Sequence, residues 1–264
     1  MIRAILLTVL AISLTACSAA SFKVEKEEYR QRVRTLGVVP LFVDGNSRLD
    51  HPQSQEVVGL LRRTSAGQHR LLVEMLKAQK GYFDVRPVVG DAVPLFGRLV
   101  QGRVWQEGER GPYHHYSFNA PTVAELTRQS STDALLVIVV NGAVRNAKRW
   151  DRTRLSYLEA PFNSVLVTAV VVLPSGEILW EYQADKPFLD LQYPDFDEAY
   201  YNRSDEIATH FITLAGLERC FQEPGRKWLQ DTVLPRPYQE LFDRLVVELK
   251  PGLLNPFEKK AAAQ

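Results

Sequence analysis

The stretch that decides the fold is Asp133–Val144, with the sequence DALLVIVVNGAV. A short continuous apolar run, without alternation of polar residues, is typical of a strand that is buried on both faces of a sheet. It is the most apolar strand candidate in the chain. We therefore expect it to be the central strand of a sheet that is covered by helices.

The residues before this strand predict a β-α-β unit. Residues 35–43, TLGVVPLFV, form a second continuous apolar run and predict another buried strand. Residues 54–81 have a helical apolar pattern, interrupted near 64–67 and stopped by Gly81. Residues 82–89 then predict a strand, and two parallel strands joined in this way need a crossover connection.

The residues flanking the central strand predict further helices and a hairpin. Residues 121–131 predict a helix, in which Thr122 and Glu125 have the spacing of a capping box. Residues 163–173 and 177–184 predict a hairpin around the turn PSG. A helix capped by Ser204 is expected to bury Ile207, Phe211, Leu214 and Leu217.

The last predicted helix has one apolar stripe, formed by Tyr238, Leu241, Phe242, Leu245 and Leu249. Residues 90–120 contain seven glycines and prolines between Gly90 and Pro112, and predict an irregular insertion with room for a short hairpin. We expect one α/β sandwich domain over residues 35–252, with a mixed sheet and packed helices, followed by a flexible tail at 253–264.

The amino terminus has the layout of a secretory signal, with Arg3 before an apolar run at 5–14. Leu14–Cys17, LTAC, resembles the lipobox of bacterial lipoproteins. This resemblance implies that residues 1–16 are removed and that Cys17 is acylated, and Ser18 implies the outer membrane. The alternative is an ordinary signal peptide with a chance cysteine.

Residues 17–34 are mostly polar and charged after the cysteine, and predict a lipidated tether. The chain has two cysteines, so a lipidated Cys17 leaves Cys220 without a disulfide partner. A small buried residue is the expected role of Cys220, and a reactive thiol is the alternative. Loss of Arg3 with the signal changes the formal charge from +1 to zero, which argues against a nucleic-acid surface.

The order of these elements, with phrases such as LGVVPLF, GYFDV and VLVTAVVVLPSGEILWEY, resembles a group of envelope lipoproteins and domains. The group includes the curli-secretion lipoprotein CsgG, the penicillin-binding-protein activator LpoB, the polysaccharide-export lipoprotein PelC and the amino-terminal domain of TolB. The resemblance implies an α/β sandwich that binds other proteins or forms rings. Residues 90–120 and 188–235 depart from the group's pattern.

Signatures of common catalytic sites are missing from the sequence, including G-x-S-x-G, the phosphate loop, H-E-x-x-H and C-x-x-C. Asp195, Asp197 and Glu206 have the spacing of a calcium loop, but Tyr200 stands where the loop needs glycine. The adjacent His114 and His115 would point to opposite faces of a strand. We therefore expect no metal and no cofactor.

Candidate partner-binding residues lie in the 90–120 segment, since aromatic side chains on a long loop are plausible interface anchors. They are Trp105, Tyr113, His115, Tyr116 and Phe118. A second aromatic cluster, at Phe188, Tyr193, Phe196, Tyr200 and Tyr201, could bind a partner or a sugar, or could cover the core.

Together these features predict a periplasm-facing outer-membrane lipoprotein that acts as a non-enzymatic accessory or assembly factor. Its partners would be the membrane, through the lipid, and other envelope proteins or polymers, but not nucleic acid. One alternative is a homo-oligomeric ring subunit for secretion or polysaccharide export. Another is a hydrolase of envelope polymers that uses Asp195, Asp197 or Glu198.

Overall fold

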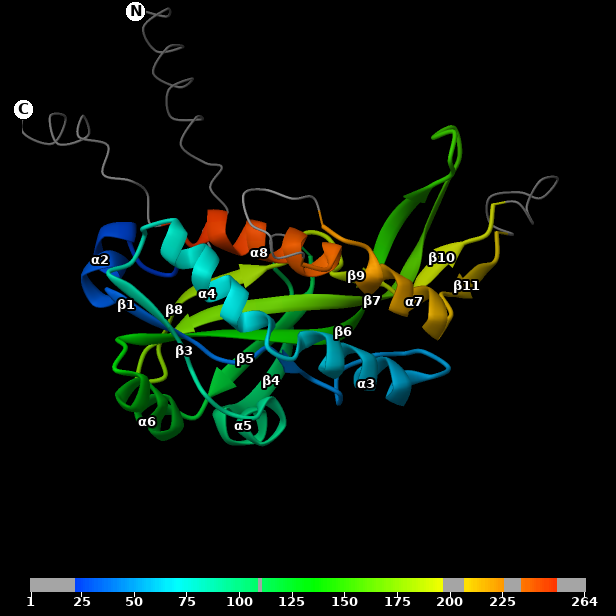
Figure 1. Cartoon of the computed structure of the whole chain (residues 1–264). Helices are drawn as coiled ribbons and strands as arrows, with labels where there is room; N and C mark the ends of the chain where they lie inside the picture. The colour runs from blue at the N-terminus through cyan, green and yellow to red at the C-terminus, as the bar shows by residue number, and fades with distance from the viewer. Residues whose placement is uncertain (1–21, 109–110, 197–206, 226–233, 251–264) are drawn as a thin grey trace, which may run out of the picture.

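The computed structural model describes residues 22–108, 111–196, 207–225 and 234–250, and its main sheet is mixed (Figure 1). The sheet has the strand order β3-β1-β6-β7-β8, with β2 beside β6 and β9 beside β7. Its strands are β1 Thr35–Val38, β2 Phe42–Val43, β3 Asp84–Pro87, β6 Ala134–Trp150, β7 Tyr157–Val172, β8 Ile178–Gln183 and β9 Leu189–Asp190. Strands β3, β1 and β6 are parallel, whereas β6, β7 and β8 are antiparallel.

Helices cover both faces of this sheet, and each face has its own hydrophobic core (Figure 1). One core includes side chains of α2 Lys26–Arg32, α3 Ser54–Ser65, α4 Gln68–Ala78, α7 Leu214–Gln222 and α8 Arg236–Glu248. The other includes side chains of α5 Ala92–Leu99, α6 Ala120–Ser130 and the hairpin of β4 Val100–Gln106 and β5 Tyr113–Phe118. A small separate ribbon pairs β10 Gln192–Pro194 with β11 Thr209–Phe211. The expected α/β sandwich with a mixed sheet is confirmed.

The strand predicted at 133–144 is central, and residues 134–143 are buried. Gly142 is required in it because a Cβ atom there would lie 2.3 Å from the backbone oxygen of Arg48. The amide of Gly142 donates to Ser47 Oγ at 2.7 Å. The chain that follows β2 therefore crosses the central strand in direct backbone contact.

The segment at 90–120, predicted to be irregular, is regular. Asp91 begins α5 by accepting a hydrogen bond from the amide of Val93, and Leu95 and Leu99 are buried. Strands β4 and β5 then form an antiparallel hairpin. Gly102 lies within β4, and Gly111 lies at the turn with a φ of +96°, a value that favours glycine.

The prediction of a tether at 17–34 is wrong from residue 22 onward, because this part of the chain packs on the domain. Phe22 forms a bridge with Trp180 of β8, and the amide of Lys23 donates to the carbonyl of Leu179 at 2.8 Å. Helix α2 buries Tyr29, whose hydroxyl lies 2.8 Å from that of Tyr82. The signal at 1–16, Cys17 and the tail at 253–264 lie outside the described residues.

Several predicted helix boundaries also differ. Asn119, rather than Thr122, caps α6 by accepting a hydrogen bond from the amide of Thr122. Thr213 caps α7, Phe211 lies in β11, and Ser204 is outside the described residues.

Helix α4 ends at Ala78, before the predicted stop at Gly81, and Lys80 adopts the left-handed φ of 56°. No helix within the described ranges has the length and apolar character needed to cross a bilayer.

Candidate partner-binding surface

The aromatic residues predicted to bind partners from the 90–120 segment mostly face inward. Tyr113, Tyr116 and Phe118 are buried, so their prediction as exposed interface anchors is wrong. His115 is partly buried, and its Nδ1 lies 2.7 Å from Glu181 Oε1. Trp105 keeps an exposed ring, which packs edge-on against His114 with 4.7 Å between ring centroids.

The hairpin is attached to the domain by a buried acidic group, Asp44. The hydroxyl of Tyr116 donates to Asp44 Oδ2 at 3.0 Å, and the guanidinium of Arg103 pairs with the same carboxylate. Burial raises the pKa of Tyr116 above its ordinary range, and the charge of Asp44 adds to the rise. Tyr116 is therefore a hydrogen-bond donor at neutral pH, with a structural role.

A second acidic group, Glu181 of β8, fastens the hairpin from the other side. It accepts from the hydroxyl of Tyr113 at 3.3 Å and pairs with Lys23 at 3.0 Å, in addition to His115. Burial alone would raise the pKa of this carboxyl, but the hydrogen bonds from His115 and Lys23, with their charges, hold it below its ordinary value. Glu181 is thus ionised at neutral pH.

The exposed candidate surface lies elsewhere, on the hairpin that β6 and β7 form beyond the sheet. We call residues 145–162 the arm. In Figure 1 it is the green hairpin that projects at the upper right. Its strands pair without a break from Arg145 opposite Phe162 to Trp150 opposite Tyr157. This long ladder keeps the arm extended from the domain.

The two faces of the arm differ. On the inner face, Arg149 pairs with Asp190 of β9, and its guanidinium carbon lies 5.4 Å from the ring centroid of Phe162. On the outer face, the rings of Trp150 and Tyr157 pack with centroids 5.0 Å apart. They remain 50% and 42% exposed, respectively.

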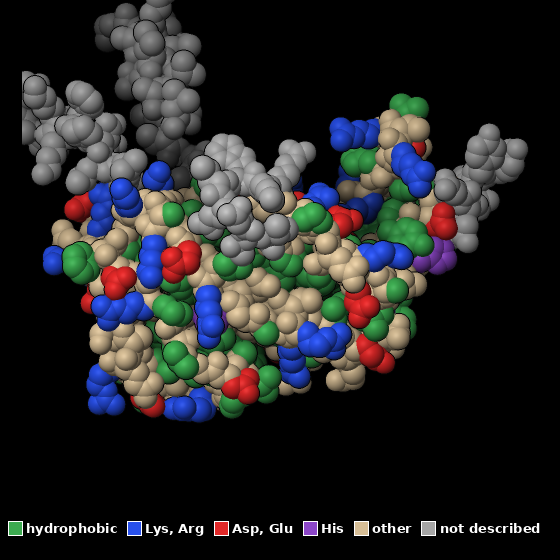
Figure 2. All heavy atoms as spheres, in the orientation of Figure 1, with side chains coloured by type: hydrophobic (Ala, Val, Ile, Leu, Met, Phe, Trp, Pro, Cys, Tyr) green, Lys and Arg blue, Asp and Glu red, His purple; other side chains and the backbone are tan. Residues whose placement is uncertain are grey.

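The outer face also carries a cation. The ammonium of Lys148 lies 4.8 Å from the ring centroid of Trp150 and 3.5 Å from that of Tyr157. Cation–π contacts of this kind hold the two rings and the charge together as one unit. Figure 2 shows hydrophobic and basic side chains side by side on the arm at the upper right.

The tip of the arm is ordered by Asp151. Its Oδ1 accepts from the amide of Leu155 at 3.0 Å, and its Oδ2 accepts from the hydroxyl of Thr153 at 2.6 Å. The hydrogen bond from Thr153, together with those from the loop amides, lowers the pKa of Asp151. The turn presents Leu155, which is 85% exposed, to solvent.

Basic residues outnumber acidic ones on the arm. The basic residues are Arg145, Lys148, Arg149, Arg152 and Arg154, and the acidic residues are Asp151 and Glu159. Such a surface can bind an anionic group through Lys and Arg while the aromatic rings bury apolar area. The strands predicted at 133–144 and 163–173 end where the arm begins, so this surface was not predicted. The signal was the run RWDRTRLSY at 149–157, in which aromatic and basic residues surround one aspartate.

The second predicted aromatic cluster is split. Phe188 packs on Phe221 and Tyr238 in the core, whereas the ring of Tyr193 is exposed beside His210. Tyr200 and Tyr201 lie outside the described residues, as do Asp197, Glu198 and Glu206.

The other residues considered for catalysis or metal binding do not form a common site. Asp195 lies 3.7 Å from His210, and Cys220 is a partly buried free thiol. Across the described part of the chain, no three His, Cys, Asp or Glu side chains come together as metal ligands.

Comparison with known proteins shows a distant structural likeness. No protein-family model and no curated protein matches the sequence. The fold is similar to that of a neuraminyllactose-binding hemagglutinin homolog from Helicobacter pylori, over 83% of this chain and 86% of that chain, at 10% identity and a TM-score of 0.38. A likeness at this level leaves the function to be argued from the residues of the chain itself.

Proposed function

We propose that this chain is a periplasm-facing outer-membrane lipoprotein that serves as a non-enzymatic binding module for other envelope components. The lipobox-like LTAC at Leu14–Cys17 supports the anchor. The arm is the observation that supports the binding role, because it exposes Trp150, Leu155 and Tyr157 on a projecting, fully paired hairpin. Aromatic residues near Arg and Lys are the residue types that contribute most to binding at interfaces.

The position of Phe22 supports an anchor that keeps the domain close to the membrane. Phe22 is already paired with Trp180. The five residues from Cys17 to Phe22 could span at most about 18 Å when fully extended. A lipid on Cys17 would therefore hold the domain close to the bilayer, in reach of envelope components beside it.

The charge of the arm favours an anionic partner, such as an acidic protein surface or an acidic envelope polymer. Three basic side chains, Lys148, Arg152 and Arg154, lie within seven residues, whereas Arg149 is paired with Asp190. Attraction between such a group and an anionic surface weakens as salt screens it, over about 10 Å at 0.1 M.

Site-specific photocrosslinking in cells tests this proposal. A photoreactive residue at Leu155 is expected to give a discrete crosslinked product with an envelope component. The matched control is Phe83, an exposed aromatic residue just before β3 and outside the arm. The product should decrease when Trp150→Ala is combined with Lys148→Ala, and should decrease with added salt in membrane preparations. Equal products from positions 155 and 83 would contradict the binding role of the arm.

The non-enzymatic part of the proposal has its own test. The purified full chain, incubated with peptidoglycan or exopolysaccharide from the same envelope, is expected to release no soluble fragments. Sustained turnover that is lost on substitution of Asp195 would instead support a hydrolase.

A further inference from the structure

The chain topology places a crevice at one edge of the sheet. Strands β1 and β3 are parallel, with Val38 opposite Pro87, so both end at the same edge. After β1 the chain passes through β2 and then forms α3 and α4, which pack in one core, whereas α5, which follows β3, packs in the core on the other face. Adjacent strands whose connections leave to opposite faces open a crevice outside their carboxyl ends, where ligands bind in open α/β sheets.

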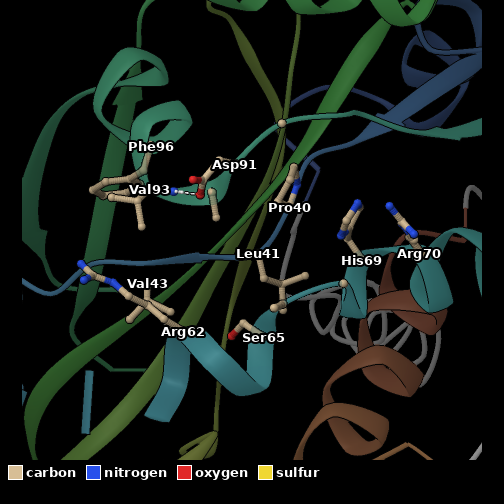
Figure 3. A pocket seen from close by; sticks show the side chains of 14 residues that line it. Pro40, Leu41, Val43, Arg62, Ser65, His69, Arg70, Asp91, Val93 and Phe96 are labelled. Carbon is tan, nitrogen blue, oxygen red and sulfur yellow. Dashed lines mark hydrogen bonds between the residues drawn. The ribbon is translucent and has the colours of Figure 1, made fainter. Parts of the chain in front are cut away.

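A cavity of about 350 Å³ lies at this place (Figure 3). This volume is within the range of small-molecule sites. Its apolar wall is formed by Pro40, Leu41, Val43, Val93 and Phe96. Such a wall can bury a short hydrocarbon or the side chain of a peptide.

The amino end of α4 lies at the opposite wall. Gly67 precedes the helix with a φ of +77°, no side chain caps its first turn, and no acidic residue lies there. The first amides of a helix carry a partial positive charge and attract anions. The partial positive charge of these amides is therefore not neutralised by a side chain of the first turn of α4.

His69 places a buried polar side chain at this wall of the cavity. Its side chain lines the cavity, and Figure 3 shows the imidazole directed toward Pro40. The residue is only 7% exposed, and its Nδ1 is buried without a hydrogen-bond partner among the described residues. Burial, with the charge of Arg70, lowers the pKa of His69, so the ring is neutral at pH 7 and can donate one hydrogen bond. Buried polar atoms without partners are rare in folded proteins and call for an explanation.

Two arginines complete the positive side. Arg62 and Arg70 line the cavity and form no ion pair within the described ranges. In Figure 3, Arg70 lies beside His69, and Arg62 lies below Val93 at the other end. Asp91 is held at the start of α5, where it accepts from the amide of Val93 at 3.2 Å.

Ser65, His69 and Asp91 are residue types of a hydrolytic triad but are not arranged as one. The hydroxyl of Ser65 lies 2.9 Å from that of Tyr238, and His69 Nδ1 accepts nothing from Asp91 and donates nothing to it. The crevice thus has the features of a binding site rather than those of an acyl-transfer site.

We propose that this crevice binds a small amphipathic anion, a carboxylate or phosphate joined to a short apolar body, with the anionic group at His69 and Arg70 and the apolar body on Leu41 and Phe96. The inference is independent of the arm and of the lipid anchor.

Histidine NMR of the purified full chain tests the inference. The chain has five histidines, and the His69 signal can be assigned from its loss in His69→Gln. Octanoate or octyl phosphate should shift this signal in a saturable way. Inorganic phosphate, which lacks the apolar body, and octyl glucoside below its micelle concentration, which lacks the charge, should bind about tenfold more weakly or not at all. Octyl phosphate binding tighter than octanoate would favour a phosphorylated end group, and the reverse would favour a carboxyl end.

Arginine variants distinguish a built site from general attraction. Arg70→Gln should weaken octyl phosphate binding about tenfold, the effect of losing one charged hydrogen bond, without changing the melting temperature. The matched control is Arg63→Gln, because Arg63 is an exposed arginine of α3 that pairs with Glu218 and does not line the cavity. Equal binding of octyl glucoside, equal loss in Arg63→Gln, or an unmoved His69 signal would overturn the inference.

Discussion

The ammonium of Lys23 lies 3.0 Å from the carboxylate of Glu181, which joins the segment next to the proposed lipid anchor to the edge strand β8. The same carboxylate binds His115 of the β4–β5 hairpin. One buried acid therefore connects the amino-terminal segment, the sheet and the hairpin. The anchor would be fastened to the body of the domain rather than separated from it by a long tether.

Glu181→Gln should lower the free energy of unfolding by about 1.5–3 kcal/mol at neutral pH, because it removes the charge from buried hydrogen bonds. The pKa of Glu181 is lowered in the folded state, so the stability it gives is present above its ordinary value of 4.5 and is lost as pH falls through the folded pKa. Urea titrations at neutral pH and in acid should show the difference between the two proteins shrinking in acid.

The control for Glu181 is Glu177→Gln, which removes an exposed partner of Arg32. Exposed ion pairs contribute about 0–1 kcal/mol. If both variants lose the same stability at neutral pH, the buried network is not the cause.

Tyr116→Phe should cost about 1.5–3 kcal/mol, because the buried carboxylate of Asp44 loses one of its donors. Chemical denaturation measures the loss, and Tyr157→Phe, on the exposed arm, should stay within about 0.5 kcal/mol of the parent. Combined Tyr113→Ala and Tyr116→Ala should lower the melting temperature. An unchanged melting temperature would contradict their structural role and would support the prediction that they bind a partner.

The order of the main elements could be predicted because burial leaves a direct mark on the sequence. The apolar run at 133–144 lies in the buried strand β6, and the stripe at Tyr238, Leu241, Phe242 and Leu245 is the buried face of α8. The run at 35–43 is buried as predicted, but it forms two short strands, β1 and β2, instead of one. These patterns reflect the period of each element and its burial, which are local properties.

The partner-binding surface could not be predicted in the same way, because exposure depends on what packs against a residue. Tyr113 and Tyr116 follow glycines and prolines, but Glu181 and Asp44, distant in sequence, provide their buried partners. Trp150 and Tyr157 remain exposed because β6 and β7 extend beyond the other strands of the sheet, and the run at 149–157 does not show where those strands end. The crevice is lined by residues of α4 and α5, which are distant in sequence and are brought together by the strand order of the sheet.

Leu245→Ala should cost about 2–5 kcal/mol, because Leu245 is fully buried between α8 and the sheet and truncation leaves a cavity. The matched control is Val247→Ala on the same helix, since Val247 is 72% exposed. It should change the free energy of unfolding by less than about 0.5 kcal/mol. Equal losses would mean that helix propensity, rather than packing, sets the effect.

Cys17→Ser should move the protein from the membrane fraction to the soluble fraction, or stall it uncleaved, because the side chain can no longer accept an acyl group. A single acyl chain binds a bilayer marginally and two or more bind it stably, at about 0.8 kcal/mol per buried CH₂. Cys220→Ser is the matched control, and it should remain in the membrane fraction because Cys220 lies in α7, within the folded domain. Membrane fractionation that includes a salt wash measures where each variant is found. If Cys17→Ser still pellets with outer membranes after that wash, the domain is held there by something other than lipid, and the basic arm at Lys148–Tyr157 is the first surface to substitute.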